Sequence, residues 1–329
     1  MKQVPHFFPT LLSLFFLPKF LSHYLHASAH EKQLIRLSKN DIMLSYGYYY
    51  FFLSNIRLSM PKAIILSNDH TYQQRILLKI AKTKNIPVFY FQHASVTDRF
   101  PTLNFTLSFL EGEYARSLYV QNGSDIEKIK LVGMPKFDKY YKRINKRSNI
   151  RTIGIASNLL DNIQRVRHII LLIRKYHPDL AIIYRPHPAI FSKKFRHIKK
   201  NVTREILSLP SLIISSPFKE DSFEYLSRID LNISNQSGIH LEAALLNVMP
   251  INFPFISDRK EDAYGFIKNK LVEDVQNEKE LFRLIEKYSN NRPYIRNKAK
   301  MYVNTINTPY DGKSTQLAVR YLHESLTGK

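Results

Sequence analysis

After residue 60, short apolar runs alternate with amphipathic stretches, and this alternation constrains the fold more than any other feature. The runs have the length of strands buried in a parallel sheet, and the stretches between them have apolar residues at helical spacing. The predicted strands cover 63–66, 86–91, 106–109, 129–132, 152–156, 180–184, 212–215, 231–234 and 250–253. The predicted helices cover 71–84, 162–176 and 239–246, and the tail from residue 278 is mostly helical.

A polar, basic stretch at 139–148 interrupts this alternation, which then restarts. We therefore predict two α/β units in tandem, joined near residue 145. Two such units facing each other form a cleft, which is a usual place for a ligand. The predicted division has three parts, an apolar and aromatic helical segment at 1–40 and two α/β domains at 41–145 and 146–329.

The N-terminal segment contains the apolar run 7–17, broken by Pro9. Three interpretations are open. It is a helix packed on protein, a helix lying in a membrane interface with Lys19, His23 and His26 toward the headgroups, or a signal peptide. The aromatic run 46–52 either extends a membrane-facing surface or forms a buried strand.

The excess of basic over acidic residues predicts an anionic partner. Lys and Arg number 49 against 27 Asp and Glu, so the net charge is +22. No zinc finger or aromatic RNA-binding signature is present, so we predict no nucleic-acid partner. Phosphate-bearing substrates and the anionic inner face of the cell membrane are the predicted partners, for a cytoplasmic protein peripheral to that membrane. The absence of cysteine excludes thiolate metal sites and disulfides.

The first candidate site follows the strand at 180–184, where two prolines frame a rigid turn. Arg185 offers a forked cation and His187 a hydrogen-bond donor, both suited to phosphate oxygens, and Pro188 fixes the exit of the turn. The alternative is a rigid strand exit with a surface histidine.

A second candidate lies between the strand at 231–234 and the following helix. Ser234, Asn235, Ser237 and Gly238 form a turn of small residues whose N–H and hydroxyl groups suit an anion. Ser234 or Asn235 is equally suited to cap the helix. Glu242 either accepts hydrogen bonds from ribose hydroxyls or is an ordinary acidic residue of a first helical turn.

Two further groups of polar residues end strands in the first unit. His93 and Asp69 are rival candidates for a general base, and Gln92 precedes His93. Gly133, Lys136 and Asp138 follow the last strand of that unit and are predicted to line the cleft. For each of these residues, the alternative interpretation is a polar residue at a strand end that has no catalytic role.

The sequence lacks the motifs of several enzyme classes. The nine glycines form neither a P-loop nor a dinucleotide fingerprint, and neither a nucleophile elbow nor a zinc-binding helix motif is present. A short Asp-x-Asp motif for metal and nucleotide diphosphate is also missing. We therefore predict neither a metal nor a cofactor, and a mechanism in which basic residues stabilise the departing phosphate.

In their order, QHA at 92–94, GMPKFD at 133–138, RPHP at 185–188 and SNQSG at 234–238 resemble bacterial surface-polysaccharide transferases of the GT-B fold. The resemblance covers about residues 60 to 320. Within this group, the motifs are most similar to those of the CDP-glycerol glycerophosphotransferases and of the sialyl-, polysialyl- and Kdo-transferases of capsule and lipopolysaccharide pathways. The fold that it implies is two Rossmann-like α/β domains facing a cleft, behind the helical N-terminal segment.

The resemblance assigns roles to matching residues. His187 and Pro188 match the His-Pro motif that holds a cytidine nucleotide, and Ser234 and Ser237 match the serine pair of that site. Gln92 and His93 match a Gln-His-Gly turn that supplies the base, with Ala94 in place of glycine. The implied function is metal-independent transfer of a sugar or glycerophosphate from a cytidine-activated donor to a hydroxyl of a surface glycan or lipid-linked glycan.

Two other functions are compatible with these residues. UDP-sugar 2-epimerases share the fold and the Ser/Gly–Glu helix start, and they need acidic and histidine residues near the C2 atom of the sugar. A membrane-docked module that binds a glycan or a protein of polysaccharide assembly needs no catalytic group. Consumption of a nucleotide donor separates the enzymes from the module.

Overall fold

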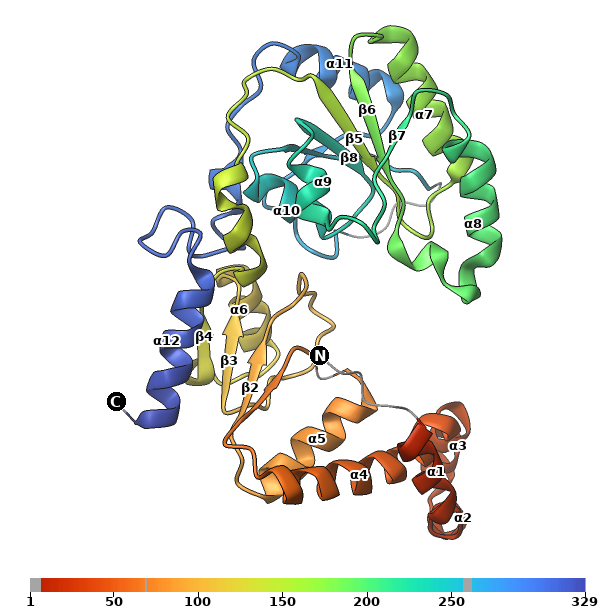
Figure 1. Ribbon diagram of the computed structural model, residues 1–329, viewed down its shortest axis with the longest axis vertical. Coiled ribbons are helices and arrows are strands. Elements are labelled where there is room, and N and C mark those ends of the chain that lie inside the picture. The colour runs from red at the N-terminus through yellow and green to blue at the C-terminus, as the bar shows by residue number, and fades with distance from the viewer. Residues whose placement is uncertain (1–6, 69, 257–261, 329) are drawn as a thin grey trace. The chain divides into compact units, whose positions relative to one another are not determined.

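The computed structural model describes residues 7–68, 70–256 and 262–328. Its contacts divide the chain into two compact α/β units, each with a parallel sheet (Figure 1). The first unit comprises Met1–His93, Leu103–Leu110 and Ser124–Lys130, and the second comprises Ala94–Thr102, Glu111–Gly123 and Leu131–Lys329. The predicted architecture of two Rossmann-like parallel-sheet units is confirmed.

The sheet of the first unit has four strands in sequence order, β1 (Ile64–Leu66), β2 (Val88–Phe91), β3 (Leu107–Leu110) and β4 (Ile129–Leu131). β1 pairs with β2 and β2 with β3 in parallel, and α5 (Tyr72–Thr83) connects the first two strands. Short apolar runs predicted all four strands because strands buried in a parallel sheet lack a polar alternation.

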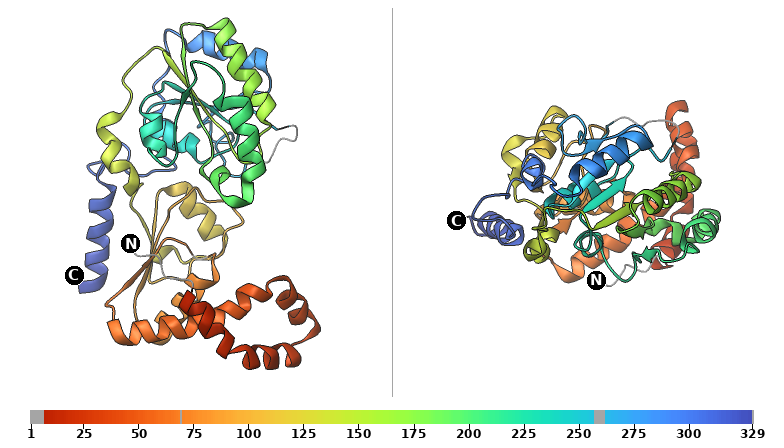
Figure 2. Two further views of the ribbon diagram at one scale, coloured as in Figure 1. Left: turned by 45° about the vertical axis from the view of Figure 1, so that its right-hand side comes forward. Right: turned by 90° about the horizontal axis from the view of Figure 1, so that it is seen from above.

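Four helices precede this sheet, α1 (Phe7–Phe15), α2 (Leu17–His26), α3 (Ala29–Leu37) and α4 (Lys39–Ser59). Figures 1 and 2 show α1 and α3 beside α4. The aromatic run 46–52 lies inside α4, so the alternative of a buried strand for this run is wrong. Among the described residues, no helix combines the length and the apolar character that crossing a membrane requires.

The second unit is built on a six-stranded sheet whose pairs are all parallel. Its order is β10 (Glu273–Asp274), β9 (Met249–Asn252), β8 (Leu231–Ser234), β5 (Thr152–Ala156), β6 (Ala181–Arg185) and β7 (Ile213–Ile214). The α-helices of this unit are α6 (Glu113–Gln121), α7 (Ile163–Tyr176), α8 (Arg196–Val202), α9 (Ser222–Leu226), α10 (Ile239–Leu245), α11 (Glu278–Tyr288) and α12 (Ser314–Thr327). Shorter turns of helix include η2 (Pro135–Arg143) and η3 (Pro188–Phe191).

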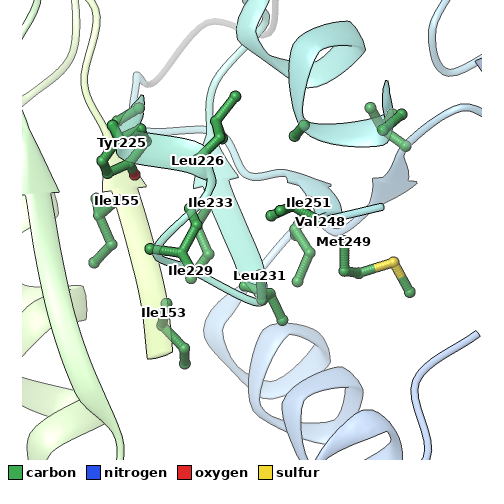
Figure 3. Close-up of a cluster of buried hydrophobic side chains, with 14 of the residues drawn as sticks. Ile153, Ile155, Tyr225, Leu226, Ile229, Leu231, Ile233, Val248, Met249 and Ile251 are labelled. Atoms are coloured by element: carbon green, nitrogen blue, oxygen red, sulfur yellow. The ribbon is translucent and has the colours of Figure 1, made fainter. Parts of the chain in front are cut away.

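The core of the second unit lies around β5, β8 and β9 (Figure 3). Ile153, Ile155 and Ile233 are buried there, and each such side chain stabilises the fold by about 1.5–3 kcal/mol. Tyr225 of α9 packs so closely on β5 that a Cβ atom on Gly154 would lie 2.3 Å from its hydroxyl oxygen. Glycine at this strand position is therefore a packing requirement.

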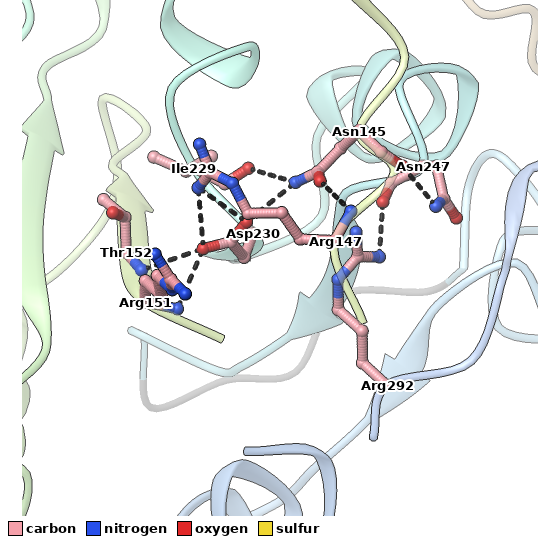
Figure 4. Close-up of polar contacts among 8 residues, drawn as sticks. All are labelled: Asn145, Arg147, Arg151, Thr152, Ile229, Asp230, Asn247 and Arg292. Atoms are coloured by element: carbon pink, nitrogen blue, oxygen red, sulfur yellow. Dashed lines mark hydrogen bonds and ion pairs between the residues drawn. The ribbon is translucent and has the colours of Figure 1, made fainter. Parts of the chain in front are cut away.

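A buried carboxylate ties the chain before β5 to the amino end of β8 (Figure 4). Asp230 Oδ2 accepts the backbone N–H groups of Arg151 and Thr152 at 2.9 and 3.0 Å, and Oδ1 accepts from Asn145 Nδ2 at 2.8 Å. Arg147 Nη1 donates to the same Oδ1 at 3.2 Å. Part of the polar stretch predicted from the sequence at 139–148 is thus bound to the sheet.

Candidate functional site

The carboxyl ends of three strands lie in one row of the second unit. Ala156 of β5 pairs with Arg185 of β6 on one side and with Ser234 of β8 on the other. β5 is also where the order of the sheet reverses, since β6 and β7 extend one edge and β8 to β10 extend the other. Ligands of open parallel sheets bind outside such a reversal point. The predicted residues that follow β6 and β8 therefore lie at the edge where a ligand is expected.

Arg185 is buried and held by its own unit. Its Nη1 donates to Ser215 Oγ at 2.7 Å and its Nη2 to the carbonyl oxygen of Glu220 at 3.2 Å, while the guanidinium lies over the ring of Tyr225. Burial lowers the pKa of this guanidinium. These contacts anchor the segments after β7, so Arg185 supports the edge of the sheet at the site.

His187 is half-buried and has a defined hydrogen-bond direction. Its Nδ1 accepts the backbone N–H of Ala189 at 3.1 Å, which caps η3, and exposed Pro188 is the first residue of that turn. A neutral ring that accepts at Nδ1 carries its hydrogen on Nε2. Burial lowers the pKa of His187, which favours this neutral form near pH 7. His187 Nε2 is therefore a neutral donor suited to an anionic oxygen.

Ser234 and Asn235 are buried at the end of β8 and support the loop. The Ser234 hydroxyl donates to the carbonyl oxygen of Ala156 at 2.8 Å, and Asn235 Nδ2 donates to Asp161 Oδ1 at 3.3 Å. His240 Nε2 lies 3.1 Å from the carbonyl oxygen of Asn235. Burial lowers the pKa of His240 to about 4, so this ring is neutral at physiological pH. These side chains fix the shape of the turn.

Ser237 and Gly238 are partly exposed at the start of α10. The backbone N–H of Ile239 lies 3.5 Å from Ser237 Oγ, a long capping contact. A Cβ atom added to Gly238 would have Ser95 Oγ as its nearest neighbour, at 3.5 Å. Since α10 has only seven residues, its dipole is short. The Ser237 hydroxyl and the backbone around Gly238 are the groups of this turn that a ligand can approach.

Glu242 forms an ion pair with Lys136, at 2.6 Å between Oε1 and Nζ. The Lys136 side chain is 44% exposed and that of Glu242 is 12% exposed. Burial opposes the charge of Lys136, but Glu242 and the nearby Glu111 raise the pKa of its ammonium. The pair therefore combines a stable cation with a carboxylate whose second oxygen can accept a hydrogen bond.

Glu111 was not predicted and is the most perturbed acid near this pair. Its side chain is buried, and burial raises the pKa of its carboxyl to about 8, against the opposing effect of Lys136. A carboxyl that is neutral at pH 7 can donate a proton, and the neighbouring ammonium can stabilise the carboxylate that remains. The sequence signal for Glu111 is its position directly after the apolar run 107–110.

Gly133 and Asp138, both predicted for the cleft, contact the C-terminal segment of the second unit. Gly133 has a φ of +77°, and a Cβ atom there would lie 2.3 Å from Thr305 Oγ1. The Asp138 carboxylate accepts the N–H groups of Ser314 and Thr315 at 2.8 and 2.7 Å, which caps α12. Lys136 is the residue of this predicted group that joins the cluster with Glu242.

The predicted base candidates lie in the first unit. His93 is exposed after the carboxyl end of β2, and Gln92 N–H donates to the carbonyl oxygen of Phe109 at 3.0 Å. Asp69 lies outside the described residues. Over the ranges 7–68, 70–256 and 262–328, no group of three or more His, Asp or Glu side chains is arranged to hold a metal ion.

No protein-family model matches this sequence, and no curated protein is significantly similar to it. Solved structures share its fold. A UDP-bound S. aureus protein, MnaA, is 14% identical with a TM-score of 0.62 over 86% of this chain and 81% of its own.

Two further structures are UDP-GlcNAc 2-epimerases. The enzyme from Methanocaldococcus jannaschii, in complex with UDP-GlcNAc and UDP, is 17% identical with a TM-score of 0.58, covering 85% of this chain and 81% of its own. The enzyme from Neisseria meningitidis, bound to UDP-GlcNAc, is 16% identical with a TM-score of 0.57, covering 86% and 81%. The fold of this chain is thus the GT-B-like fold of these proteins.

These neighbours correct the functional prediction made from the sequence. The enzymes from M. jannaschii and N. meningitidis are 2-epimerases, which are isomerases, and the assignment to glycosyltransferases or glycerophosphotransferases with a cytidine donor is wrong. The sialyltransferase and CDP-glycerol families are likewise unsupported. The physical reason is that the His-Pro turn and the Ser/Gly–Glu helix start lie at the strand ends of a fold that these enzyme classes share. Such motifs do not identify the bond that reacts.

Proposed function

We propose that this protein is an isomerase that inverts the configuration at C2 of a UDP-linked sugar of the UDP-N-acetylglucosamine class. One observation carries the proposal: the buried carboxyl of Glu111, with its pKa raised to about 8, beside the Lys136–Glu242 ion pair. The fold shared with UDP-GlcNAc 2-epimerases supports it. The acidic and histidine residues that such a reaction needs are present on this chain.

The chemistry of the proposal is a proton exchange. Inversion at C2 removes the C2 proton while the C1–O bond to UDP breaks, so the C–H electron pair forms a C1=C2 double bond and UDP leaves with the electrons of the C1–O bond. UDP then adds back at C1 as C2 takes a proton on the opposite face of the ring, so the enzyme must both accept and donate a proton. In our proposal Glu111 is one of these groups, and the Lys136 ammonium stabilises its carboxylate form. We keep His93 and Asp69 as rival candidates for the other group in proton transfer.

The nucleotide is proposed to bind at the strand ends of the second unit. His187 Nε2, the Ser237 hydroxyl and the backbone at Gly238 contact the phosphates, with Arg185 and Pro188 holding the turn of His187 in place. Ser234 and Asn235 set the shape of the second turn. The Glu242 oxygen that Lys136 leaves available accepts a hydrogen bond from ribose. Gln92, Gly133 and Asp138 are proposed to support the site.

We also propose a setting for this reaction. The protein would work at the anionic inner face of the cell membrane, where its net charge of +22 favours retention and where sugars for the cell envelope are used. The three-part division at residues 40 and 145 stays a prediction, with the nucleotide assigned to 146–329.

The test is exchange of the C2 hydrogen with solvent. The purified full-length protein is incubated with UDP-GlcNAc in D₂O, and the sugar nucleotide is analysed by mass spectrometry and proton NMR. We expect one deuterium at C2 and a second set of anomeric signals from the C2 epimer. CMP-sialic acid and CDP-glycerol serve as unreactive comparisons.

A matched pair of variants ties the exchange to the site. His187→Ala should raise KM by about tenfold or more with a smaller change in kcat, because it removes a phosphate contact. His197→Ala removes an exposed histidine of α8 and should leave both constants unchanged. Absence of deuterium from UDP-GlcNAc and from other UDP-sugars would contradict the proposal, as would turnover of a cytidine donor alone.

A further inference from the structure

The first two helices present their apolar side chains to the outside. In α1 the exposed residues are Phe7, Phe8, Leu11, Leu14 and Phe15, with exposed fractions between 45% and 71%. At 100° per residue these positions fall within one arc of the helix. A helix of a globular protein normally turns such an arc toward the core, so this arrangement needs a partner.

The opposite face of α1 is occupied by α4. Pro9 and Ser13 are buried there, and a Cβ atom on Gly47 of α4 would lie 1.8 Å from the carbonyl oxygen of Pro9. Phe16, just after α1, stacks on Tyr50 of α4 with ring centroids 4.0 Å apart. Because this close contact fixes the rotation of α1, its apolar arc is held outward.

Helix α2 repeats the arrangement and adds a polar side that carries one lysine. Leu17, Leu21 and Leu25 recur every four residues and are exposed, and the helix has no buried residue. Its opposite side carries Lys19, His23 and His26, all exposed, and the helix contains no acidic residue. An exposed apolar stripe with a polar side that carries a lysine opposite it is the pattern of a helix that lies in a lipid interface.

The charge of the segment favours an anionic surface. Between residues 7 and 40 there is one acidic side chain, Glu31, and its carboxylate is used in the capping box of Ser28. Four cationic side chains accompany it: Lys19, Lys32, Arg36 and Lys39. A protein partner with an apolar groove would satisfy the leucines and phenylalanines but gives no reason for this excess of positive charge.

We propose that α1 and α2 form a docking surface for an anionic phospholipid bilayer, with the phenylalanines and leucines among the acyl chains and Lys19 among the headgroups. The surface lies in the interface without crossing it. This inference rests on the proposed placement at a membrane but not on the proposed reaction, because vesicle binding is measured without a sugar nucleotide.

The chain contains no tryptophan, so the fluorescence of a single introduced tryptophan reports on that position alone. Leu25→Trp places one reporter on the docking surface, and Leu58→Trp places one on an exposed position of α4 outside it. Full-length proteins are mixed with vesicles of phosphatidylcholine alone or with about one-third phosphatidylglycerol. We expect a blue shift of the Leu25→Trp emission with the anionic vesicles and none for Leu58→Trp.

Loss-of-binding variants complete the test. Leu21→Gln/Leu25→Gln should weaken sedimentation with anionic vesicles by at least about tenfold, while Leu58→Gln should leave it unchanged. Lys19→Glu should lower the preference for phosphatidylglycerol. Since these side chains are exposed, the thermal unfolding of each variant should match that of the unmodified protein.

Three results would overturn the inference: no shift of the Leu25→Trp emission on anionic vesicles, equal binding of Leu21→Gln/Leu25→Gln and Leu58→Gln, or a dimer in vesicle-free solution that Leu21→Gln/Leu25→Gln dissociates. The last would make a second copy of the chain the occupant. Deuterium exchange in vesicle-free solution is a separate readout, so the docking surface and the proposed reaction can fail independently.

Discussion

The polar side chains near the two ends of strand β8 differ in burial and in hydrogen bonding. At the amino end, both oxygens of the buried Asp230 accept hydrogen bonds, from two backbone N–H groups and from Asn145 and Arg147 (Figure 4). Beyond the carboxyl end, Lys136 keeps an exposed fraction of 44% although it pairs with Glu242, and burial raises the pKa of Glu111 to about 8.

The difference separates structural polar groups from reactive ones. A carboxylate whose oxygens are satisfied inside the protein is stable and chemically inert, and its loss is expressed in folding. A carboxyl with a perturbed pKa beside a partly exposed cation is available for proton transfer, and its loss is expressed in rate and in the pH dependence of stability. Variants at the two ends should therefore affect different measurements.

The largest effect is expected from Asp230→Ala at the amino end. The change leaves two backbone N–H groups and the side chains of Asn145 and Arg147 without their acceptor, so the free energy of unfolding should fall by roughly 3–5 kcal/mol. Urea unfolding measures it. Glu220→Gln, which alters a partly exposed ion pair with Arg228, is the control and should change stability by less than about 1 kcal/mol. Equal effects of the two variants would remove the distinction.

The next effect concerns Glu111 and pH. The folded protein keeps this proton up to about pH 8, whereas the unfolded chain releases it near the ordinary pKa of 4.5. The unfolded state binds fewer protons in that interval, so stability falls as pH rises through it. Glu111→Gln abolishes this titration.

Urea unfolding at about pH 5.5 and about pH 8 should therefore show a change of about 3 kcal/mol in the stability difference between Glu111→Gln and the unmodified protein. The variant gains relative stability at the higher pH. Glu113→Gln, at an exposed glutamate paired with Arg116, should show no such change. Parallel pH profiles for Glu111→Gln and the unmodified protein would rule out the raised pKa.

A smaller effect in free energy is expected from Lys136→Met at the carboxyl end. The rate of C2 exchange should fall by about 100-fold, equivalent to about 2.7 kcal/mol, because the variant removes the cation beside Glu111 and Glu242. Lys136→Arg keeps the charge and should recover part of the rate. Lys139→Met breaks an exposed pair with Asp221 and should leave the rate unchanged, so equal losses in the two methionine variants would contradict the assignment.

The smallest effect is expected from Gly238→Ala. The φ of Gly238 is −58°, and the nearest atom to an added Cβ is at 3.5 Å, so the free energy of unfolding should change by less than about 0.5 kcal/mol. Gly133→Ala is the comparison, because its φ of +77° and the 2.3 Å approach to Thr305 predict a loss of about 2 kcal/mol or more. Thermal unfolding of both variants measures these changes in stability. A larger loss of stability in Gly238→Ala than in Gly133→Ala would be inconsistent with this geometry.

The fold was predictable where burial leaves a plain apolar run. The strands at 152–156 and 231–234 match β5 and β8 to the residue, because both are central strands of a parallel sheet. β10 (Glu273–Asp274) pairs with β9 but was not predicted. Both of its residues are acidic, whereas the sequence signal for a buried strand is a run of apolar residues. The aromatic run 46–52 suits a strand by propensity, but packing of α1 on Gly47 places it in a helix.

The site was predictable only in part. Arg185, His187 and Ser234 could be proposed because they end or follow apolar strands, and such positions gather at one edge of a parallel sheet. The pairing of Lys136 with Glu242 joins residues 106 positions apart, which no local pattern encodes. The effect of burial on Glu111 depends on tertiary packing. The reaction was misassigned because the recognisable motifs mark strand ends of a shared fold and do not identify the bond that reacts.

The cap that Asp138 provides for α12 has a consequence for synthesis of the protein. The second unit begins at Ala94, yet one of its helices is capped by a contact that spans 176 residues and ends at Ser314. During synthesis this contact cannot form until Ser314 has left the ribosome. The last segment of the first unit ends at Lys130, so this unit can begin to fold early in synthesis, whereas the second unit depends on a contact of long sequence separation that forms late.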